Sequence, residues 1–401
     1  MEINCYHCNT KTTVNIQWDA TLVACPSCGT IYNKNNSNDY VFKDRLKKIN
    51  YYNSLEIGQT ATLNKQEYTI IGYLIKGYGI DISWIEYILQ NKEGAVLYLS
   101  ESSGNFVLLE QIEYEKKVGN HPLYIDYQEK TFDRYDYCYP TLKFAAGCFD
   151  FNIFDKIELI EYINPPYLLS FEKFGKEQTA YYGKHISRKE IKKAFNTTQI
   201  PPKTEIGMAQ PFPINIRNLV MVFCVVAILT LLSHLYFTKD RVTQEVLNTE
   251  IPFDKYSNKE FVSPTFELKG SAAPLQISLI SDVNNSWANA QIALINEKNN
   301  EEIYASKDIE YYHGYTDGEN WTEGSTNEDF NICGVAAGKY HLSITPSKAT
   351  EDVSNSSMYI NVTWYKPSFR NFYMIIIFMV VFVLVLYYIS KYFEDKRWGN
   401  Q

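Results

Sequence analysis

The chain has 401 residues and a formal net charge of −8 at pH 7, from 38 basic and 46 acidic residues. Residues 239–370 hold 11 basic and 19 acidic residues and so account for the whole excess, whereas the remainder balances at 27 against 27. General nucleic-acid binding needs a basic face, so this distribution argues against nucleic acid as a partner. The length allows two or three domains, and the 33 tyrosines and 22 phenylalanines favour strand-rich ones.

Two cysteine pairs mark residues 1–32. Cys5 and Cys8 form one C-x-x-C pair, and Cys25 and Cys28 form a second pair after 16 intervening residues. This spacing is typical of a zinc ribbon, in which four thiolates close a tetrahedral structural site with no position left for catalysis. Two disulfides in a secreted domain are one alternative, and a thioredoxin-like redox pair is another, although no βαβ pattern surrounds either pair. We therefore predict a zinc ribbon that binds structural Zn²⁺ through these four cysteines.

Residues 55–196 alternate strand-like apolar runs with short turns, which predicts a β-rich domain. The pattern repeats within the domain. IEYI at residues 85–88 returns at 160–163, and LYLSE at residues 97–101 is echoed by LLSFE at 168–172. We therefore expect an internal duplication of two antiparallel half-units.

The repeat places one glutamate at the same point of each half-unit, Glu86 in the first and Glu161 in the second. If the halves are pseudosymmetric, the two carboxylates form a pair, and their mutual repulsion raises the pKa of one of them. The alternative is that each glutamate is a strand residue bonded to a neighbouring turn. Ser187 and Glu190 then form a capping box that begins a short helix, and residues 197–215 are a proline-rich linker.

Two apolar stretches follow, at residues 219–237 and 372–390, and each has 19 residues without Lys, Arg, Asp or Glu. At about 1.5 Å per residue, a helix of this length covers most of the ~30 Å hydrocarbon core of a bilayer. A lone apolar segment in lipid must satisfy its own backbone hydrogen bonds, which favours a helix. Cations flank both stretches as interfacial anchors do, Arg217 and Lys239 the first stretch and Arg370 and Lys391 the second. The sequence therefore predicts transmembrane helices over 216–237 and 370–392, with two buried core helices as the alternative.

The order of these features predicts a topology. The chain opens with MEINCYHCNT, which lacks the charged and apolar regions of a cleavable signal peptide, so we expect the first span to act as an uncleaved signal anchor. Free zinc-ligand thiols are typical of a reducing compartment, which favours a cytosolic amino terminus. We therefore expect a multi-pass protein of the cell (inner) membrane whose N- and C-termini are both cytoplasmic, with a cytosolic tail at 393–401.

The segment between the spans predicts an outward-facing, all-β sandwich over residues 260–366. Its runs alternate apolar and polar residues with period two, and turns separate them at nearly regular spacing. The predicted core positions are Leu275, Ile277, Leu279, Ile292, Leu294, Leu342 and Ile344.

One part of this outer domain, residues 308–329, holds seven acidic residues and no Lys or Arg. Aromatic rings beside carboxylates suit a glycan, a cation or a basic partner. The alternative is a solvated hairpin whose Trp321 fills the edge of the sandwich. The candidate binding face consists of Tyr311, Tyr312, Asp317, Glu319, Trp321 and Glu323.

Several motifs together resemble bacterial membrane proteins that carry the domain of unknown function 4178. After the four cysteines come G-x-x-x-x-L…E-Y-x-I-x-G at residues 58–72, W-x-E-Y at 84–87 and E-Y-I-x-P-P-x-L-L-S-x-E at 161–172. The outer domain resembles that of longer members in S-P-x-F-E-L at 263–268 and in Y-Y-x-G-x-x-D-G-E-x-W-x-E-G-S at 311–325. The resemblance implies this architecture and no particular activity.

The sequence contains neither H-E-x-x-H nor G-x-S-x-G. We therefore expect no enzyme, but a membrane sensor or scaffold that couples the outer sandwich to a cytosolic interaction module. Its expected partners are the membrane, proteins on the cytosolic side and a glycan or basic ligand outside, without nucleic acid. A membrane-anchored enzyme or enzyme subunit that uses Glu86 and Glu161 is the alternative.

Overall fold

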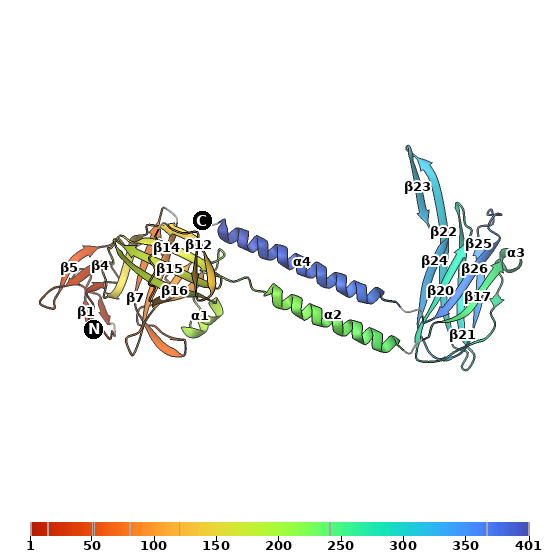
Figure 1. The fold of residues 1–401 in the computed structure, drawn as a ribbon, viewed down its shortest axis with the longest axis horizontal. Coiled ribbons are helices and arrows are strands. Elements are labelled where there is room, and N and C mark those ends of the chain that lie inside the picture. The colour runs from red at the N-terminus through yellow and green to blue at the C-terminus, as the bar shows by residue number, and fades with distance from the viewer. Residues whose placement is uncertain are drawn as a thin grey trace. The chain divides into compact units, whose positions relative to one another are not determined.

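The computed structural model describes residues 2–13, 16–49, 51, 53–79, 82–119, 121–239, 242–365 and 368–399. Within these ranges the chain is mostly β, with two long apolar helices (Figure 1). Four cysteines form a cluster near the N-terminus. It divides into two compact units. The first consists of Met1–Ile216 with Leu384–Gln401, and the second of Arg217–Val383.

The first unit contains sixteen described strands and one short helix. They are β1 (Glu2–Asn4), β2 (Lys11–Thr13), β3 (Leu22–Ala24), β4 (Thr30–Lys34), β5 (Tyr40–Arg45), β6 (Thr60–Leu63), β7 (Gln66–Tyr78), β8 (Ile82–Asn91), β9 (Val96–Ser102), β10 (Asn105–Ile112), β11 (Tyr124–Tyr127), β12 (Lys130–Cys138), β13 (Thr141–Phe149), β14 (Glu158–Asn164), β15 (Tyr167–Phe174), β16 (Glu177–Ile186) and α1 (Arg188–Ala194). The predicted capping box of α1 is confirmed, because the Ser187 side chain accepts from the N–H of Glu190 and the Glu190 carboxylate accepts from the N–H of Ser187 at 2.8 Å.

One antiparallel sheet dominates this unit. Its strands run in the order β11-β12-β14-β15-β16-β10-β9-β8-β7-β13-β3-β4-β5, and β6 pairs with β7. Strand β9 alternates buried and half-buried residues, as expected for a strand with one face on the core. Because β3 pairs with β13, the segment predicted as a zinc ribbon at 1–32 is joined to the domain predicted at 55–196.

The two predicted half-units have the same strand register. Glu86 on β8 lies opposite Ser100 on β9, and Glu161 on β14 lies opposite Ser170 on β15. In both halves the tyrosine after the glutamate is buried and lies opposite a leucine. The halves meet where their last strands, β10 and β16, pair with each other. Residues opposite one another in a sheet share a face, so the two glutamates occupy equivalent positions.

Side chains connect strands that lie far apart in the order of this sheet. The Lys76 ammonium on β7 lies 2.8 Å from the Glu172 carboxylate on β15, and the Tyr78 hydroxyl donates to Asp136 on β12 at 2.9 Å. Strands β12 and β15 belong to the opposite arm of the sheet from β7. The sheet therefore curls until its two arms face each other.

The second unit is a β-sandwich of two antiparallel sheets. One has the order β17-β26-β20-β24 and the other β18-β25-β21-β22-β23, with β19 on β25. The elements are β17 (Gln244–Pro252), α3 (Phe253–Tyr256), β18 (Phe261–Val262), β19 (Phe266–Leu268), β20 (Ala273–Ser281), β21 (Ser286–Asn296), β22 (Glu302–Thr316), β23 (Glu319–Gly324), β24 (Asn327–Val335), β25 (Gly338–Lys348) and β26 (Ser357–Trp364). All seven predicted core residues are buried, which confirms the period-two interpretation. The sandwich includes β17 and so begins before the predicted boundary at residue 260.

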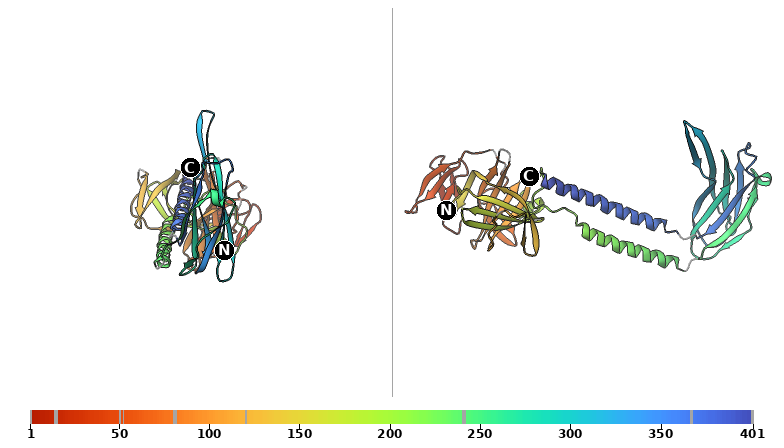
Figure 2. Two further views of the ribbon diagram at one scale, coloured as in Figure 1. Left: turned by 90° about the vertical axis from the view of Figure 1, so that its right-hand side faces the viewer. Right: turned by 45° about the horizontal axis from the view of Figure 1, so that its top comes forward.

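The two apolar helices are α2 (Ile216–Thr238) and α4 (Arg370–Trp398). Each has the length and composition to cross a membrane, and only 0% and 11% of their most apolar windows are buried, which disagrees with two core helices. Within the second unit they pack antiparallel, because Phe223 contacts Phe382 whereas His234, later on α2, contacts Phe369, which precedes α4 (Figure 2). Helix α4 continues to Trp398, through most of the range predicted as a tail at 393–401.

Candidate functional site

Two turns of the same design hold the four cysteines. In the first turn the N–H of Asn9 donates to the carbonyl of Cys5 at 2.8 Å, and in the second the N–H of Gly29 donates to that of Cys25 at 2.9 Å. Asn9 and Gly29 both have positive φ angles, 56° and 68°, which asparagine and glycine adopt at low cost. A Cβ at Gly29 would lie 2.5 Å from the carbonyl oxygen of Leu46, so the second turn requires glycine. The C-x-x-C sequence thus folds in the same way twice.

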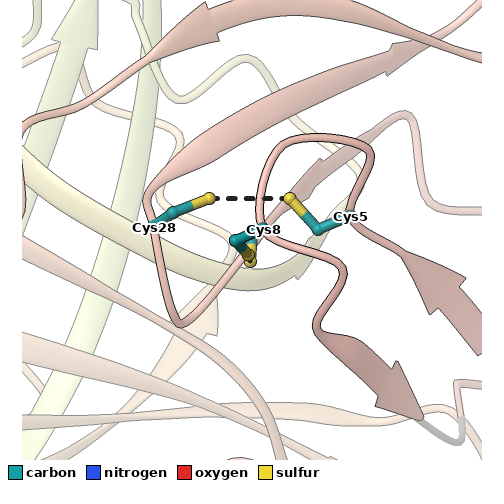
Figure 3. A group of neighbouring side chains, drawn as sticks. Cys5, Cys8 and Cys28 are labelled. Carbon is teal, nitrogen blue, oxygen red and sulfur yellow. Dashed lines mark hydrogen bonds between the residues drawn. The ribbon is translucent and has the colours of Figure 1, made fainter.

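The four sulfur atoms all lie within 4.8 Å of one another. The sulfurs of Cys5 and Cys28 are 3.5 Å apart (Figure 3). Those of Cys8 and Cys25 are 3.6 Å apart. A tetrahedral zinc site with Zn–S bonds of about 2.3 Å has sulfurs roughly 3.8 Å apart, whereas a disulfide needs about 2.05 Å. The donor set and its spacing therefore fit a tetrahedral zinc ion.

Hydroxyl groups contact this cluster. The Tyr32 hydroxyl lies 3.3 Å from the sulfur of Cys5, and the Thr10 hydroxyl lies 3.2 Å from that of Cys8. The contact with Thr10 lowers the pKa of Cys8 to about 6, whereas burial raises the pKa of Cys25 to about 12. A bound cation would favour the thiolate form of all four, since a coordinating thiol is deprotonated.

The first unit also contains a cavity of about 440 Å³ between the two arms of its curled sheet. This volume lies within the range of roughly 300–1,000 Å³ that is usual for small-molecule sites. Its walls combine aliphatic and aromatic side chains with six acidic residues and one lysine. The charged residues that the sheet brings together there include Lys76, Glu86, Glu161 and Glu172.

Lys76 is at the centre of a hydrogen-bonded ion-pair network in this cavity. Its ammonium lies 2.8 Å from a carboxylate oxygen of Glu86 and 2.8 Å from one of Glu172. The Trp84 indole N–H donates to the other oxygen of Glu86 at 2.7 Å, and the Tyr181 hydroxyl donates to the other oxygen of Glu172 at 3.5 Å. Burial opposes the charge on Lys76, but the two carboxylates outweigh it and raise its pKa.

Glu161 lines the same cavity but is not bonded to this network. Among the described residues, no hydrogen bond or ion pair involves its carboxyl group. Burial, together with the charges of Asp136, Glu86 and Glu172, raises the pKa of Glu161 to about 8 against the opposing effect of Lys76. A carboxyl that titrates near neutral pH is poised for proton exchange or for the binding of a cation.

The structure therefore brings both glutamates predicted from the repeat into one cavity. The partners of Glu86 are Trp84 and Lys76, so the alternative of a hydrogen bond to a neighbouring turn is wrong for this residue. The predicted rise in the pKa of one carboxyl falls on Glu161. Sequence reasoning missed Lys76, which pairs with a carboxylate of each half-unit, Glu86 in the first and Glu172 in the second.

A second feature that the sequence analysis missed is Arg397 near the end of α4. Its side chain is fully buried within the first unit. Its guanidinium donates to the carbonyl of Gly207 at 3.0 Å and also to those of Met208 and Gln210. Glu394, one turn earlier, accepts two further hydrogen bonds, at 2.8 and 3.0 Å. We call this arrangement the Arg397 clasp.

Aromatic contacts surround the clasp. Tyr135 donates its hydroxyl to the carbonyl of Arg397 at 3.2 Å and packs against Trp398, with ring centroids 5.5 Å apart. Phe393 packs against Phe212, with ring centroids 5.6 Å apart. The clasped segment also forms part of the cavity, because Met208 lines it. Two signals in the sequence, aromatic residues beyond the apolar stretch and an i,i+3 Glu–Arg pair, could have indicated that the helix continues into protein.

The acidic-aromatic segment of the second unit forms a hairpin from β22 and β23, which Figure 1 shows extending beyond the other strands of the sandwich. Trp321 is 43% exposed, and its indole N–H donates to the Thr316 hydroxyl at 3.2 Å. The alternative in which Trp321 fills the edge of the sandwich is therefore wrong. Of the six residues of the candidate binding face, Tyr311 is the one that packs against the core of the sandwich, and it is half-buried.

Strand register divides the candidate binding face. Trp321 lies opposite Gly314, Glu323 opposite Tyr312, and Glu319 opposite Thr316. Opposite residues share a face, so Tyr312, Glu319, Trp321 and Glu323 lie on one side of the hairpin. Tyr311 lies on the other side, and Asp317 is exposed in the turn.

A comparison with protein families supports the resemblance to the domain of unknown function 4178 that the sequence motifs indicated. Residues 56–188 match the family described as "Domain of unknown function (DUF4178)", a range that contains β6 to β16 of the curled sheet and all the described lining residues of the cavity except Met208. No curated protein matches the chain.

Solved structures give no usable likeness. A structure of infectious bursal disease virus Gt strain is 9% identical, with 89% of this chain and 71% of that chain covered and a TM-score of 0.19. A structure of PNGF-II is 8% identical, with 77% and 66% covered and a TM-score of 0.20. Scores this low carry no argument about fold or function.

Proposed function

We propose that this chain is a two-pass membrane protein that acts as a non-enzymatic sensor or scaffold. In this proposal α2 and α4 cross the bilayer, the β-sandwich faces outward, and the first unit lies in the cytoplasm with both termini. The Arg397 clasp carries the proposal, because it makes the end of α4 part of the packing of the first unit. A shift of α4 would therefore act directly on residues 207–210.

Other features support the remaining parts of the proposal. The apolar side chains of α2 and α4 are mostly exposed, as lipid-facing helices require. The cysteine cluster would bind structural Zn²⁺ and stabilise the turns before β2 and β4. We assign the protein to a bacterial cell (inner) membrane, with protein partners inside, a glycan or basic ligand outside and no nucleic acid.

The topology can be tested with a native cysteine. Cys333 lies exposed on β24, and so an impermeant maleimide should label it in intact cells. The Cys333→Ser variant should lose that label, and a cysteine placed at Asn36 in that variant should remain unlabelled until the cells are opened. Labelling of the Asn36 position in intact cells would contradict the orientation.

The coupling can be tested by comparing Arg397→Ala with Lys396→Ala. Lys396 is the exposed neighbour of Arg397 and carries the same charge, so it is a matched control. In chemical crosslinking from native membranes, the wild type and Lys396→Ala should capture the same cytosolic protein. Arg397→Ala should reach the membrane at equal abundance but capture much less of it. Unchanged capture would reject the coupling.

The cavity favours a second candidate, a membrane-anchored enzyme or enzyme subunit. Glu161, with a pKa of about 8, would be a general acid and Glu86 a base. The double variant Glu86→Gln with Glu161→Gln separates the two candidates. If the double variant still captures its partner but loses an activity that the wild type has, the enzyme is favoured. If the activity of the double variant is unchanged, the sensor is favoured.

A further inference from the structure

We infer that the cavity of the first unit is a binding site for a small organic cation, a primary amine or guanidinium with an apolar body. Its charged group would lie against the carboxyls of Glu86, Glu161 and Glu172. This inference goes beyond the proposed function and does not depend on it, since the cavity lies wholly within the first unit.

The charge of the cavity selects a cation. Six acidic residues and one basic residue line it, and the one base, Lys76, already pairs with Glu86 and Glu172. Clefts lined by one sign of charge concentrate ligands of the opposite sign. Among the lining residues that the structure describes, a phosphate or carboxylate ligand would find no unpaired cation.

An unpartnered acceptor is present where the charged group would sit. The carboxyl of Glu161 has no hydrogen-bond partner among the described residues, although its equivalent Glu86 has two. Ammonium and guanidinium groups are donors only, and an ammonium needs three acceptors. Ser100 and Ser170, which lie opposite the two glutamates in register and also line the cavity, supply hydroxyl oxygens beside them.

The remaining walls suit an apolar body. The rings of Tyr98 and Tyr181 pack edge to face, with their centroids 5.3 Å apart. Leu74, Val107 and Met208 also line the cavity. Aromatic faces attract organic cations as well as apolar groups. A divalent metal ion fits less well, because the ammonium of Lys76 occupies the point 2.8 Å from both Glu86 and Glu172.

Binding would exchange a proton. A cation beside Glu161 favours its ionised form, so the carboxyl should release its proton as the ligand binds. The titratable or charged groups that influence Glu161 are Lys76 on β7, Glu86 on β8, Asp136 on β12 and Glu172 on β15. Since a proton competes with the ligand at Glu161, affinity should increase as pH rises from 6 to 8, that is, up to the pKa of about 8.

The test uses the full chain in lipid nanodiscs and isothermal titration calorimetry. The probes are 2-phenylethylamine, its anionic counterpart 3-phenylpropionate, and magnesium chloride. We expect the amine to bind, with proton release measured from the dependence of the heat on buffer. The carboxylate should bind more weakly by about tenfold or more. Equal binding of both organic probes, binding of magnesium alone, or no binding of the amine at millimolar concentration would each overturn the inference.

Variants locate the site. Glu161→Gln keeps the shape of the protonated carboxyl and should fold normally, but it should weaken amine binding by about tenfold or more and abolish proton release. Glu110→Gln is the matched control, because Glu110 is exposed on β10 and outside the cavity. If Glu161→Gln fails to fold, proton release by the wild type decides alone. Amine binding without proton release, or unchanged binding by Glu161→Gln, would reject the site.

Discussion

The cysteine cluster and the carboxylate cavity lie in the same unit but are assembled in opposite ways. The cysteines come from two turns within residues 5–28, and each turn is closed by its own backbone hydrogen bonds. Lys76 and Glu86 lie on paired strands, as do Glu161 and Glu172, but the two pairs meet only because the sheet curls. A site made of local turns can be read from spacing, whereas a site made by sheet curvature depends on contacts that spacing does not encode.

The largest effect should come from breaking the local site. Cys25→Ser should abolish zinc binding and unfold the segment around β3 and β4, because structural zinc contributes on the order of 10–16 kcal/mol in small peptides. Metal analysis of the full chain should find one zinc per wild-type chain, and hydrogen exchange should locate the unfolded segment. The control Cys224→Ser changes an exposed cysteine on α2 and should keep its zinc. A wild-type chain without zinc, or with two disulfides here, would contradict the assignment.

Breaking the non-local site should have a smaller effect, spread over the whole sheet. Lys76→Ala leaves two mostly buried carboxylates without their partner, so the free energy of unfolding should fall by about 3–5 kcal/mol. Urea denaturation measures this change. Lys92→Ala breaks an exposed pair with Glu67 and should leave the free energy of unfolding nearly unchanged, because solvent screens such a pair. Equal losses in the two variants would mean that the Lys76 network is not a buried one.

The pH dependence of stability separates the two sites further. Glu161 has a folded-state pKa of about 8 and an ordinary value of 4.5, so the folded state retains a proton that the unfolded state has lost. The free energy of unfolding should therefore fall as pH rises from about 4.5 to about 8, and this contribution should be flat above that. Glu161→Gln removes this contribution, so its stability relative to the wild type should increase with pH in urea titrations. A constant difference would show that Glu161 ionises normally.

The smallest effect on stability should come from the β22–β23 hairpin of the second unit, because Trp321 in this hairpin is exposed. Trp321→Ala should change the free energy of unfolding by less than about 0.5 kcal/mol, because the side chain is exposed. Trp364→Ala removes a buried ring from the same unit and should cost about 3–5 kcal/mol. Differential scanning calorimetry measures both variants. If the hairpin is a binding face, Trp321→Ala should also lose its outer ligand or partner.

Local signals predicted much of this molecule. The C-x-x-C turns, the capping box at Ser187 and the sandwich core around Leu275 all depend on residues close in sequence, and the structure contains each of them. The repeat also predicted that Glu86 and Glu161 are equivalent. The contacts of Lys76 with Glu172 and of Arg397 with Gly207 were not predictable in this way, because these partners lie far away in sequence. They are brought near only by the curvature of the sheet and the continuation of α4.

The Arg397 clasp also has a consequence for the order of events during synthesis. Gly207 and Arg397 are separated by 190 positions, and a ribosome that adds about 5–20 residues per second needs roughly 10–40 s to cover that distance. For that time the carbonyls of residues 207–210 lack the guanidinium that they bind in the finished protein. The first unit is therefore completed only by residues that are made after the whole sandwich has been synthesised. A chain that stops before Arg397 would contain both apolar helices and every described strand, yet it would leave this unit unfinished.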